Sequence, residues 1–302
     1  MKEKFPMYLL TTTQNFAKRI QIALLVAVAV TIFHRDAKAI ETVNLGTASG
    51  FAILAGSKIT DAGGASTIVT GNVGLYPTTG AAIGLTAGQV GGTIYTAETS
   101  GALLNGAQND LTAAYNDAAG RSVDSYLGVV DNQLGGLTLH SGVYNFGHAA
   151  TANLIGTLTL DAQGNPDAVW IFQATSDLIM ASASVVTLIN GADACNVFWQ
   201  VGSSATIGTY SDFVGNIMAD QSIALQAYAT LDGSALARIA AVTLDHNSIT
   251  AADCNGVGTA VPDGGSTLLL LGSGLVILAA FKHRFLSVLH VATDETRCYL
   301  QN

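Results

Sequence analysis

Two short runs rich in aromatic and β-branched residues constrain the fold more than any other part of the chain. Residues 169–173 (VWIFQ) recur in kind as residues 197–201 (VFWQV), within the almost uncharged stretch 167–202. Such residue types favour β-strands. Looser copies follow at 205–208, 222–225 and 241–244. Copies that return every 17 to 28 residues, roughly, predict the stacked coils of a β-solenoid.

The composition fits tight turns and packed small side chains. Charged residues make up 11% of the chain, against about 25% in typical soluble domains. The chain holds 33 glycines and only 4 prolines, while 49% of its residues are hydrophobic. That apolar content argues against disorder.

The acidic balance of the body excludes one class of partner. Between residues 40 and 260 there are three basic residues (Lys58, Arg121 and Arg238) and sixteen Asp or Glu, so 3 − 16 gives a net charge of −13. A region this acidic does not bind nucleic acid through its phosphates.

The N-terminal 39 residues read as an export signal. Lys18-Arg19 precede an apolar run from Ile20 to Phe33, and Ala37-Lys38-Ala39 supplies a small-x-small cleavage pattern. The apolar run is short for a comfortable membrane span. We therefore predict a signal peptide over 1–39, with an uncleaved anchor as the alternative.

Residues 40–260 are predicted to form the folded body. Short apolar runs separated by Gly, Thr and Ser turns indicate first coils or a cap over 45–96, and the main strand region covers 136–254. One helix is expected at about 98–119, because Leu103, Ala107, Leu111, Ala114, Tyr115 and Ala118 recur at helical spacing. A single apolar stripe suggests that this helix packs along the side of the solenoid.

A separate module follows the body. Val261-Pro262-Asp263 opens a short motif, an apolar segment runs over 268–281, and Lys282-His283-Arg284 closes it. Basic residues after an apolar segment tend to stay on the cytoplasmic side of a membrane. Residues 285–302 form a tail of unknown role.

Two of the three cysteines lie in the body. Cys195 and Cys254 both fall at the edge of a predicted coil, whereas Cys298 lies in the tail. In an exported protein Cys195 and Cys254 can form a disulfide, although the sequence does not supply the geometry. A disulfide between Cys195 and Cys254 and two free thiols are therefore the two alternatives.

No constellation of catalytic residues stands out. The body has three histidines (His140, His148 and His246), with no further ligand at metal spacing, and its acidic residues are scattered singly in turns. There is no nucleophile elbow and no phosphate-binding loop. The sequence predicts a protein that is not an enzyme and that needs no cofactor or metal.

From Leu45 to Cys254 the body resembles the large family of microbial ice-binding proteins. The stretches that carry the resemblance are LGTA at 45–48, FAILAG at 51–56, DLTAAYND at 110–117, SGVY at 141–144, TLD at 159–161, DAVWIFQ at 167–173, CNVFWQVGSSAT at 195–206, ALAR at 235–238 and AVTL at 241–244. His140 and Ser234 depart from the family pattern, which commonly has proline and arginine there. The resemblance implies a mainly β, discontinuous right-handed β-solenoid with one long helix alongside and a capping region. It also implies an antifreeze protein that binds ice crystals and slows their growth or recrystallisation.

The module at 261–284 is similar to the Val-Pro-Asp/Glu type of C-terminal sorting signal (PEP-CTERM-like). That similarity implies insertion into the membrane through 268–281, followed by processing by an exosortase-like enzyme. The alternative is an ordinary C-terminal membrane anchor that is retained. The protein would then be secreted or displayed on the cell surface of a Gram-negative-type bacterium. Surface display also suits an alternative function, an adhesion or extracellular matrix protein built on the same scaffold.

The expected ice-binding surface is a flat solenoid face of Thr, Ser and Ala. Stacked strands lie about 4.8 Å apart, and rows of hydroxyl and methyl groups at that spacing can order water as ice does. In the family such rows often read Thr-Ala/Gly-x-Thr/Asn. Degraded copies occur at 181–184 (ASAS), 209–212 (TYSD) and 227–230 (AYAT). The candidate ice-binding residues are Ser182, Ser184, Thr209, Ser211, Tyr228 and Thr230. Because Tyr210, Tyr228 and Asp212 intrude there, we expect either modest activity or an ice face elsewhere on the solenoid.

Overall fold

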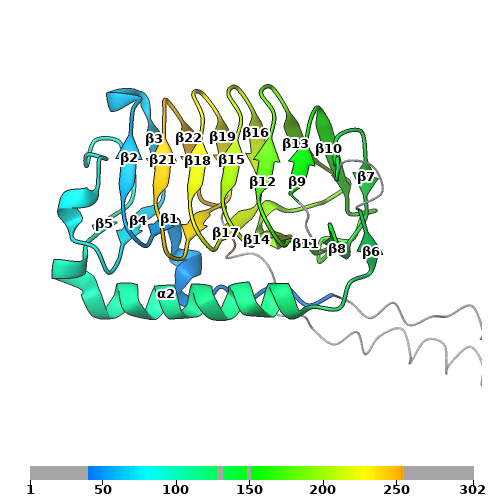
Figure 1. The fold of residues 1–302 in the computed structure, drawn as a ribbon, viewed down its shortest axis with the longest axis horizontal. Helices are drawn as coiled ribbons and strands as arrows, with labels where there is room; N and C mark the ends of the chain where they lie inside the picture. Colours follow the sequence, from blue (N-terminus) through cyan, green and yellow to red (C-terminus); the bar gives the residue numbers. More distant parts are fainter. Residues whose placement is uncertain (1–39, 128–131, 148–150, 253, 255–302) are drawn as a thin grey trace, which may run out of the picture. The chain divides into compact units, whose positions relative to one another are not determined.

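The computed structural model describes residues 40–127, 132–147, 151–252 and 254. It shows parallel strands wound into coils, with one long helix beside them (Figure 1). The chain divides into two compact units, Met1–Ala252 and Asp253–Asn302, and the coils and the helix belong to the first. The predicted signal peptide at 1–39, sorting segment at 261–284 and tail at 285–302 lie outside the described residues.

Three parallel sheets, A, B and C, form the sides of the solenoid. In spatial order, sheet A consists of β5 (Ile94–Tyr95), β4 (Asn72–Leu75), β1 (Phe51–Ala55), β20 (Ala235–Ala237), β17 (Asn216–Ala219), β14 (Val197–Val201), β11 (Trp170–Ala174), β8 (Gly142–Asn145) and β6 (Ser125–Tyr126). Sheet B consists of β2 (Ile59–Asp61), β21 (Val242–Leu244), β18 (Ile223–Leu225), β15 (Ala205–Ile207), β12 (Leu178–Met180) and β9 (Ala152–Leu154). Sheet C consists of β3 (Ile68–Thr70), β22 (Ser248–Thr250), β19 (Thr230–Asp232), β16 (Asp212–Val214), β13 (Val185–Ile189), β10 (Thr157–Asp161) and β7 (Thr138–Leu139).

Among the described residues there are one α-helix and four 3₁₀ turns. The α-helix is α2 (Ala97–Gly120), and the 3₁₀ turns are Gly46–Gly50, Gly64–Ser66, Gly80–Ala82 and Ala194–Asn196. The helix predicted at about 98–119 is therefore confirmed. Its buried stripe is Leu104, Ala107, Leu111, Ala114 and Ala118. The expectation that Leu103 faces the core is wrong, because its side chain is 46% exposed and Leu104 takes that place.

The solenoid is discontinuous. The first coil, β1–β2–β3, pairs on one side with the last coil, β20–β21–β22, so that Ile53 lies beside Ala235 and Thr60 beside Thr243. In Figure 1 the blue first coil stands next to the yellow-orange last coil. The segment between β4 and β5 continues past the first coil at that end, where Ile83 bridges to Ile59 and Val90 to Val69. This segment is the capping region that the sequence predicted.

The two aromatic runs that dominate the sequence are neighbouring strands of sheet A. β11 and β14 pair in parallel with Trp170 beside Val197 and Phe172 beside Trp199. Alternate side chains of these strands point inward, and their rings stack from coil to coil: Tyr144 on Phe172 at 5.6 Å and Phe172 on Trp199 at 4.0 Å between centroids. Phe213, on β16 of the same coil as Trp199, completes the stack with a tilted ring at 5.0 Å. This stack is the centre of the solenoid core.

Helix α2 covers the outer surface of sheet A. Its buried stripe packs on the other set of sheet A side chains, which includes Ile171, Phe198, Met218 and Leu236. Both surfaces of the central strands of sheet A are therefore buried, which explains why these strands read as continuous apolar runs rather than alternating ones.

Polar anchors fix α2 to the coils at several points. Gln173, which is buried in β11, donates its side-chain amide to the carbonyls of Ala118 and Arg121 at 2.8 and 2.9 Å, at the C-terminal end of the helix. Asp110 on the helix accepts hydrogen bonds from the hydroxyl and backbone N–H of Thr47, and these bonds lower the pKa of Asp110. Arg238 pairs with Asp220 and lies 4.5 Å from the centroid of the Tyr115 ring.

Two further observations concern the cysteines of the body and membrane-spanning helices. Cys195 and Cys254 are both disulfide-bonded. Within the part of the chain that the structure describes, no helix is long and apolar enough to cross a membrane. The apolar segment 268–281 lies outside that part.

Candidate ice-binding face

Sheets B and C are the two sides of the solenoid that α2 leaves open. Their strands are mostly three residues long, with two inward side chains and one outward, or the reverse. A flat adsorption surface has to lie on one of these sheets or at the corner between them. The two sheets differ in the charge of their outward side chains, and this difference indicates which sheet suits ice.

The outward face of sheet B carries one central row of uncharged side chains. Each comes from the middle of a strand and, apart from Thr60, lies between two buried apolar residues; Thr60 lies between buried Ile59 and half-buried Asp61. Pairing between neighbouring strands keeps these positions in line. Along the solenoid the row is Asn153, Ile179, Thr206, Ala224, Thr243 and Thr60.

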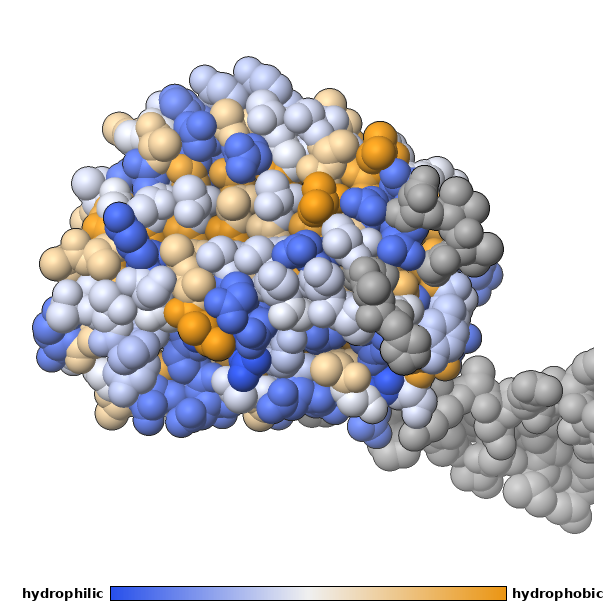
Figure 2. Space-filling view, viewed as in Figure 1, coloured by the Kyte–Doolittle hydropathy of each residue, from blue (hydrophilic) through white to orange (hydrophobic). Residues whose placement is uncertain are grey.

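Small side chains also border this row. In the coils of β15, β18 and β21 the residues two positions before the central row are Ser204, Ser222 and Ala241. Charged side chains take this place only in the coils of β12 (Asp177) and β2 (Lys58) among the described coils of the sheet. Seen from the side on which sheet B is drawn, the surface over these strands is mostly pale, meaning intermediate hydropathy, with isolated strongly hydrophobic side chains (Figure 2).

Asp177 is hydrogen-bonded to the adjoining coil. Its carboxylate accepts the backbone N–H of Ser204 at 3.0 Å, and this bond is the main reason for the lowered pKa of Asp177. The side chain is only partly exposed. The carboxylate therefore satisfies backbone groups at the edge of the sheet, beside the central row.

Sheet C is less suited to a neutral lattice. Its outward positions include Asp212 in β16 and Asp232 in β19, in the middle of the sheet. Thr230, an outward threonine in the same region, donates its hydroxyl to Asp212 at 2.7 Å. Threonines do line up at one end of sheet C, where Thr159 pairs with Thr138 and with Thr187, but the carboxylates interrupt the row further along.

The corner between sheets B and C decides which predicted site residues reach the surface. Ala183, Tyr210, Tyr228 and His246 occupy equivalent corner positions with φ of 57°, 56°, 61° and 54°. A residue with this left-handed backbone reverses the in–out alternation, so the residue that follows it points inward. Those inward residues are Ser184, Ser211, Ala229 and Asn247, each at most 1% exposed.

Two of the predicted ice-binding residues are therefore misplaced. The hydroxyl of Ser184 accepts the N–H of Gly156 at 3.1 Å, and that of Ser211 donates to the carbonyl of Ala181 at 2.9 Å. Both side chains are fully buried. Ser184 and Ser211 satisfy the backbone of the corner and cannot touch a crystal.

The other four predicted residues are accessible but do not form one surface. Ser182 is exposed and Thr209 half-buried, and both lie where sheet B meets the corner. Tyr228 projects from the corner itself and is 47% exposed. Thr230 lies on sheet C, past the corner.

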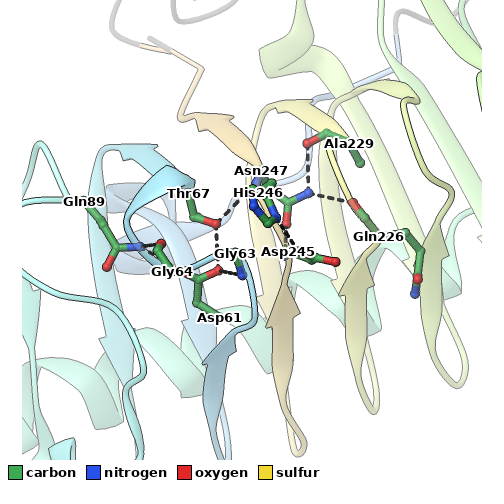
Figure 3. Close-up of polar contacts among 10 residues, drawn as sticks. All are labelled: Asp61, Gly63, Gly64, Thr67, Gln89, Gln226, Ala229, Asp245, His246 and Asn247. Carbon is green, nitrogen blue, oxygen red and sulfur yellow. Dashed lines mark hydrogen bonds and ion pairs between the residues drawn. The ribbon is translucent and has the colours of Figure 1, made fainter.

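A buried polar network holds this corner where the first coil joins the last (Figure 3). Asp61 accepts hydrogen bonds from the Thr67 hydroxyl at 2.7 Å and from the side-chain amide of Gln89 at 2.7 Å. The Thr67 hydroxyl in turn accepts the backbone N–H of Asn247 at 3.3 Å. The Asn247 side chain donates to the carbonyls of Gln226 and Ala229. These bonds link four coils, so the end of sheet B is fixed although its strands come from opposite ends of the body.

The central row of sheet B was missed by reasoning from the sequence. Its signal was present: Thr206, Ala224 and Thr243 each stand alone between two aliphatic residues in the recurring copies at 205–207, 223–225 and 242–244. That pattern marks a half-buried strand with one outward position. The four-residue motifs at 181–184, 209–212 and 227–230, which are similar to those of the family, indicate the corner instead.

The described residues offer little for catalysis. No group of three or more His, Cys, Asp and Glu side chains within them is placed to hold a metal ion. His246 pairs with its neighbour Asp245 at 2.6 Å. His140 lies 4.0 Å from Asp161, whose lowered pKa is due first to a hydrogen bond from Asn190.

The chain is similar to proteins that are named ice-binding proteins. The chain is 43% identical to an ice-binding protein of Nostoc sp. (strain HG1) over 266 residues, which cover 87% of this chain and 95% of that protein. It is 37% identical to an ice-binding protein of Flavobacterium frigoris (strain PS1) over 224 residues, covering 72% and 79% of the two chains.

Solved structures show the same fold. The crystal structure of an ice-binding protein from the Antarctic ascomycete Antarctomyces psychrotrophicus matches with a TM-score of 0.62 at 36% identity, over 70% of this chain and 99% of that one. A glycosylated ice-binding protein from an Arctic yeast matches with a TM-score of 0.65 at 29% identity, over 73% and 96%.

Two family profiles account for the body and the C-terminal module separately. A VPDSG-CTERM motif matches residues 260–285, which confirms the predicted sorting signal. The Ice-binding-like profile matches residues 53–250, nearly the whole described body. With the relatives above, this match shows that the chain belongs to the Ice-binding-like family.

Proposed function

We propose that this protein binds ice through the outward face of sheet B and thereby slows the growth or recrystallisation of ice crystals. The observation that carries the proposal is the straight, uncharged central row from Asn153 to Thr60, held by paired strands of a rigid solenoid. Ser182 and Thr209 extend this surface toward the corner. Relatives that are named ice-binding proteins support the same function.

The physical argument rests on spacing and rigidity. Neighbouring strands place equivalent side chains about 4.8 Å apart. Threonine offers a methyl and a hydroxyl group on a side chain with few rotamers, so little conformational entropy is lost when its first water layer is ordered. Long charged side chains would hold water in other arrangements, and the central row has none.

We expect modest activity. Ile179 interrupts the hydroxyl pattern in the central row and is 46% exposed, and Asp177 and Lys58 border the row near its two ends. The longest stretch of small neutral side chains therefore spans only the coils of β15, β18 and β21. A shorter lattice match gives weaker adsorption.

Substituting Thr206 by tyrosine tests the face. Thr206 lies at the middle of the central row, and a bulky ring there separates the flat surface from the crystal lattice. We expect the fraction of protein taken up by growing ice to fall on the order of tenfold, which corresponds to about 1.4 kcal/mol. The measurement is ice-affinity partitioning, with thermal hysteresis as a second readout.

The matched control is Thr187→Tyr. Thr187 is a half-buried, outward threonine in the middle of β13 on sheet C, so the same ring is added to the other open face. Uptake of this variant should equal that of the unchanged protein. Equal losses for both variants would assign ice binding to neither sheet in particular, and no uptake of the unchanged protein would refute ice binding altogether.

The C-terminal module is proposed to direct the protein to the cell surface. The VPDSG-CTERM match supports recognition by an exosortase-like enzyme, after insertion through 268–281, in a Gram-negative-type bacterium. Protein recovered from the producing cells should have lost the residues beyond the motif, and a Pro262→Ala variant should keep them. Intact-mass measurement decides the point. A recovered chain that still ends at Asn302 would contradict processing.

A further inference from the structure

Three aromatic rings form an exposed ladder at the corner between sheets B and C. Tyr210 and Tyr228 are stacked with their centroids 5.0 Å apart and an angle of 4° between planes, and His246 follows at 4.8 Å. The left-handed backbone of all three residues directs their side chains out of the corner. Tyr210 is 64% exposed and Tyr228 47%.

The ladder ends at Tyr210 with an open ring face. In the adjoining coil the equivalent position is Ala183, which has the same left-handed backbone but no ring. This explains why Tyr210 is more exposed than Tyr228, whose two faces contact Tyr210 and His246. The next coil contributes Ile155, an exposed aliphatic side chain at 64%. Beyond Tyr210 the row of corner side chains is therefore aliphatic rather than aromatic.

Stacking within the ladder accounts for the contacts between the rings but not for the open face. A tyrosine at the surface joins a large apolar ring to a polar hydroxyl group, and for this reason tyrosine is enriched at binding interfaces. The chemistry that suits a single flat tyrosine face is the C–H face of a pyranose ring. A sugar stacked on Tyr210 would occupy the position of the missing fourth ring.

The polar groups around the ladder favour neutral sugars. Asp212 follows Tyr210 by two residues and Asp245 is paired with His246, so carboxylates flank the rings. Asp212 uses one oxygen, Oδ1, for the Thr230 hydroxyl, and carboxylates are acceptors for the hydroxyl groups of a sugar. The same negative charges repel anionic polymers, as does the net charge of the body.

We propose that the open face of Tyr210, continued by Tyr228, is a binding site for pyranose rings of a neutral polysaccharide. The site is separate from the central row of sheet B and goes beyond ice binding. A surface-displayed protein with both sites would adsorb ice on one face and hold a neutral glycan at the adjoining corner.

Affinity electrophoresis tests this proposal with the purified protein. Native gels are run with and without a soluble neutral β-glucan, hydroxyethyl cellulose, and in parallel with polygalacturonate as the anionic arm. We expect the neutral glucan to retard the protein and polygalacturonate to leave its migration unchanged. Tyr210→Ala should reduce the retardation about tenfold or more, because it removes the ring on which the sugar would stack.

Tyr126→Ala is the matched control, because Tyr126 is equally exposed, at 65%, but lies on β6 of sheet A. It should migrate as the unchanged protein does. The proposal is overturned if the neutral glucan does not retard the protein, if Tyr210→Ala and Tyr126→Ala behave alike, or if polygalacturonate retards the protein as strongly. In a separate ice-affinity partitioning experiment, Tyr210→Ala should be taken up by ice as well as the unchanged protein is. A failure of the glycan proposal can therefore be told apart from a failure of the ice-binding proposal.

Discussion

Replacing Trp199 by alanine is expected to lower the free energy of unfolding by about 3–5 kcal/mol. Trp199 is 1% exposed and lies between Phe172 and Phe213 in the ring stack of the core. Its indole N–H also donates to the carbonyl of Val214 at 3.0 Å. The substitution therefore leaves a cavity in the core and removes the hydrogen bond to the Val214 carbonyl.

Urea or thermal unfolding followed by circular dichroism measures the loss. Trp199→Phe is the informative companion, because it keeps an aromatic ring in the stack and removes only the hydrogen bond and part of the volume. We expect it to cost about 1–2 kcal/mol. A loss below about 1 kcal/mol for the alanine variant would mean that the ring stack does not hold the coils together.

The aromatic strands could be predicted from the sequence because they are buried on both sides. β11 and β14 face the core with one set of side chains and α2 with the other, so they appear as unbroken apolar runs, and their similarity gave the coil repeat. The helix was equally visible from its spacing. These features depend on residues close together in the chain.

The details of the open faces could not be predicted in the same way. A strand of three residues contains too few positions to fix its own alternation, and a one-residue shift turns every side chain to the opposite side. At the corner, tyrosine and histidine adopt a left-handed backbone. The sequence would have indicated this conformation only if glycine or asparagine had stood there. This shift buried Ser184 and Ser211, which the sequence had placed on the surface.

Long-range pairing was also beyond the sequence. The first coil pairs with the last one, so Thr60 follows Thr243 as the final member of the central row, although 183 positions separate the two residues. No local pattern in β2 indicates this partner. The Asp61, Thr67 and Asn247 contacts that secure the junction become recognisable only once the coils are stacked.

Replacing Gly233 by alanine is expected to prevent close stacking of two coils. Gly233 has φ of 142°, a conformation that other residues rarely adopt, at the turn from sheet C into sheet A. A methyl group on it would lie 2.1 Å from the carbonyl oxygen of Gly215 in the adjoining coil. That atom belongs to the backbone and is fixed by the pairing of β17 with β20, so it cannot rotate away as a side chain would.

Gly191→Ala separates the two causes of this effect. Gly191 has φ of 88°, but nothing lies within 4 Å of its added methyl group. Backbone strain alone should therefore cost it about 1–3 kcal/mol, whereas Gly233→Ala adds the collision and should lower the yield of folded, soluble protein as well as its thermal midpoint. Circular dichroism melting of the two variants compares them directly. If both melt at the same temperature, the collision is relieved by a shift of the coils, and close packing of glycines at this corner is not what sets the spacing of the solenoid.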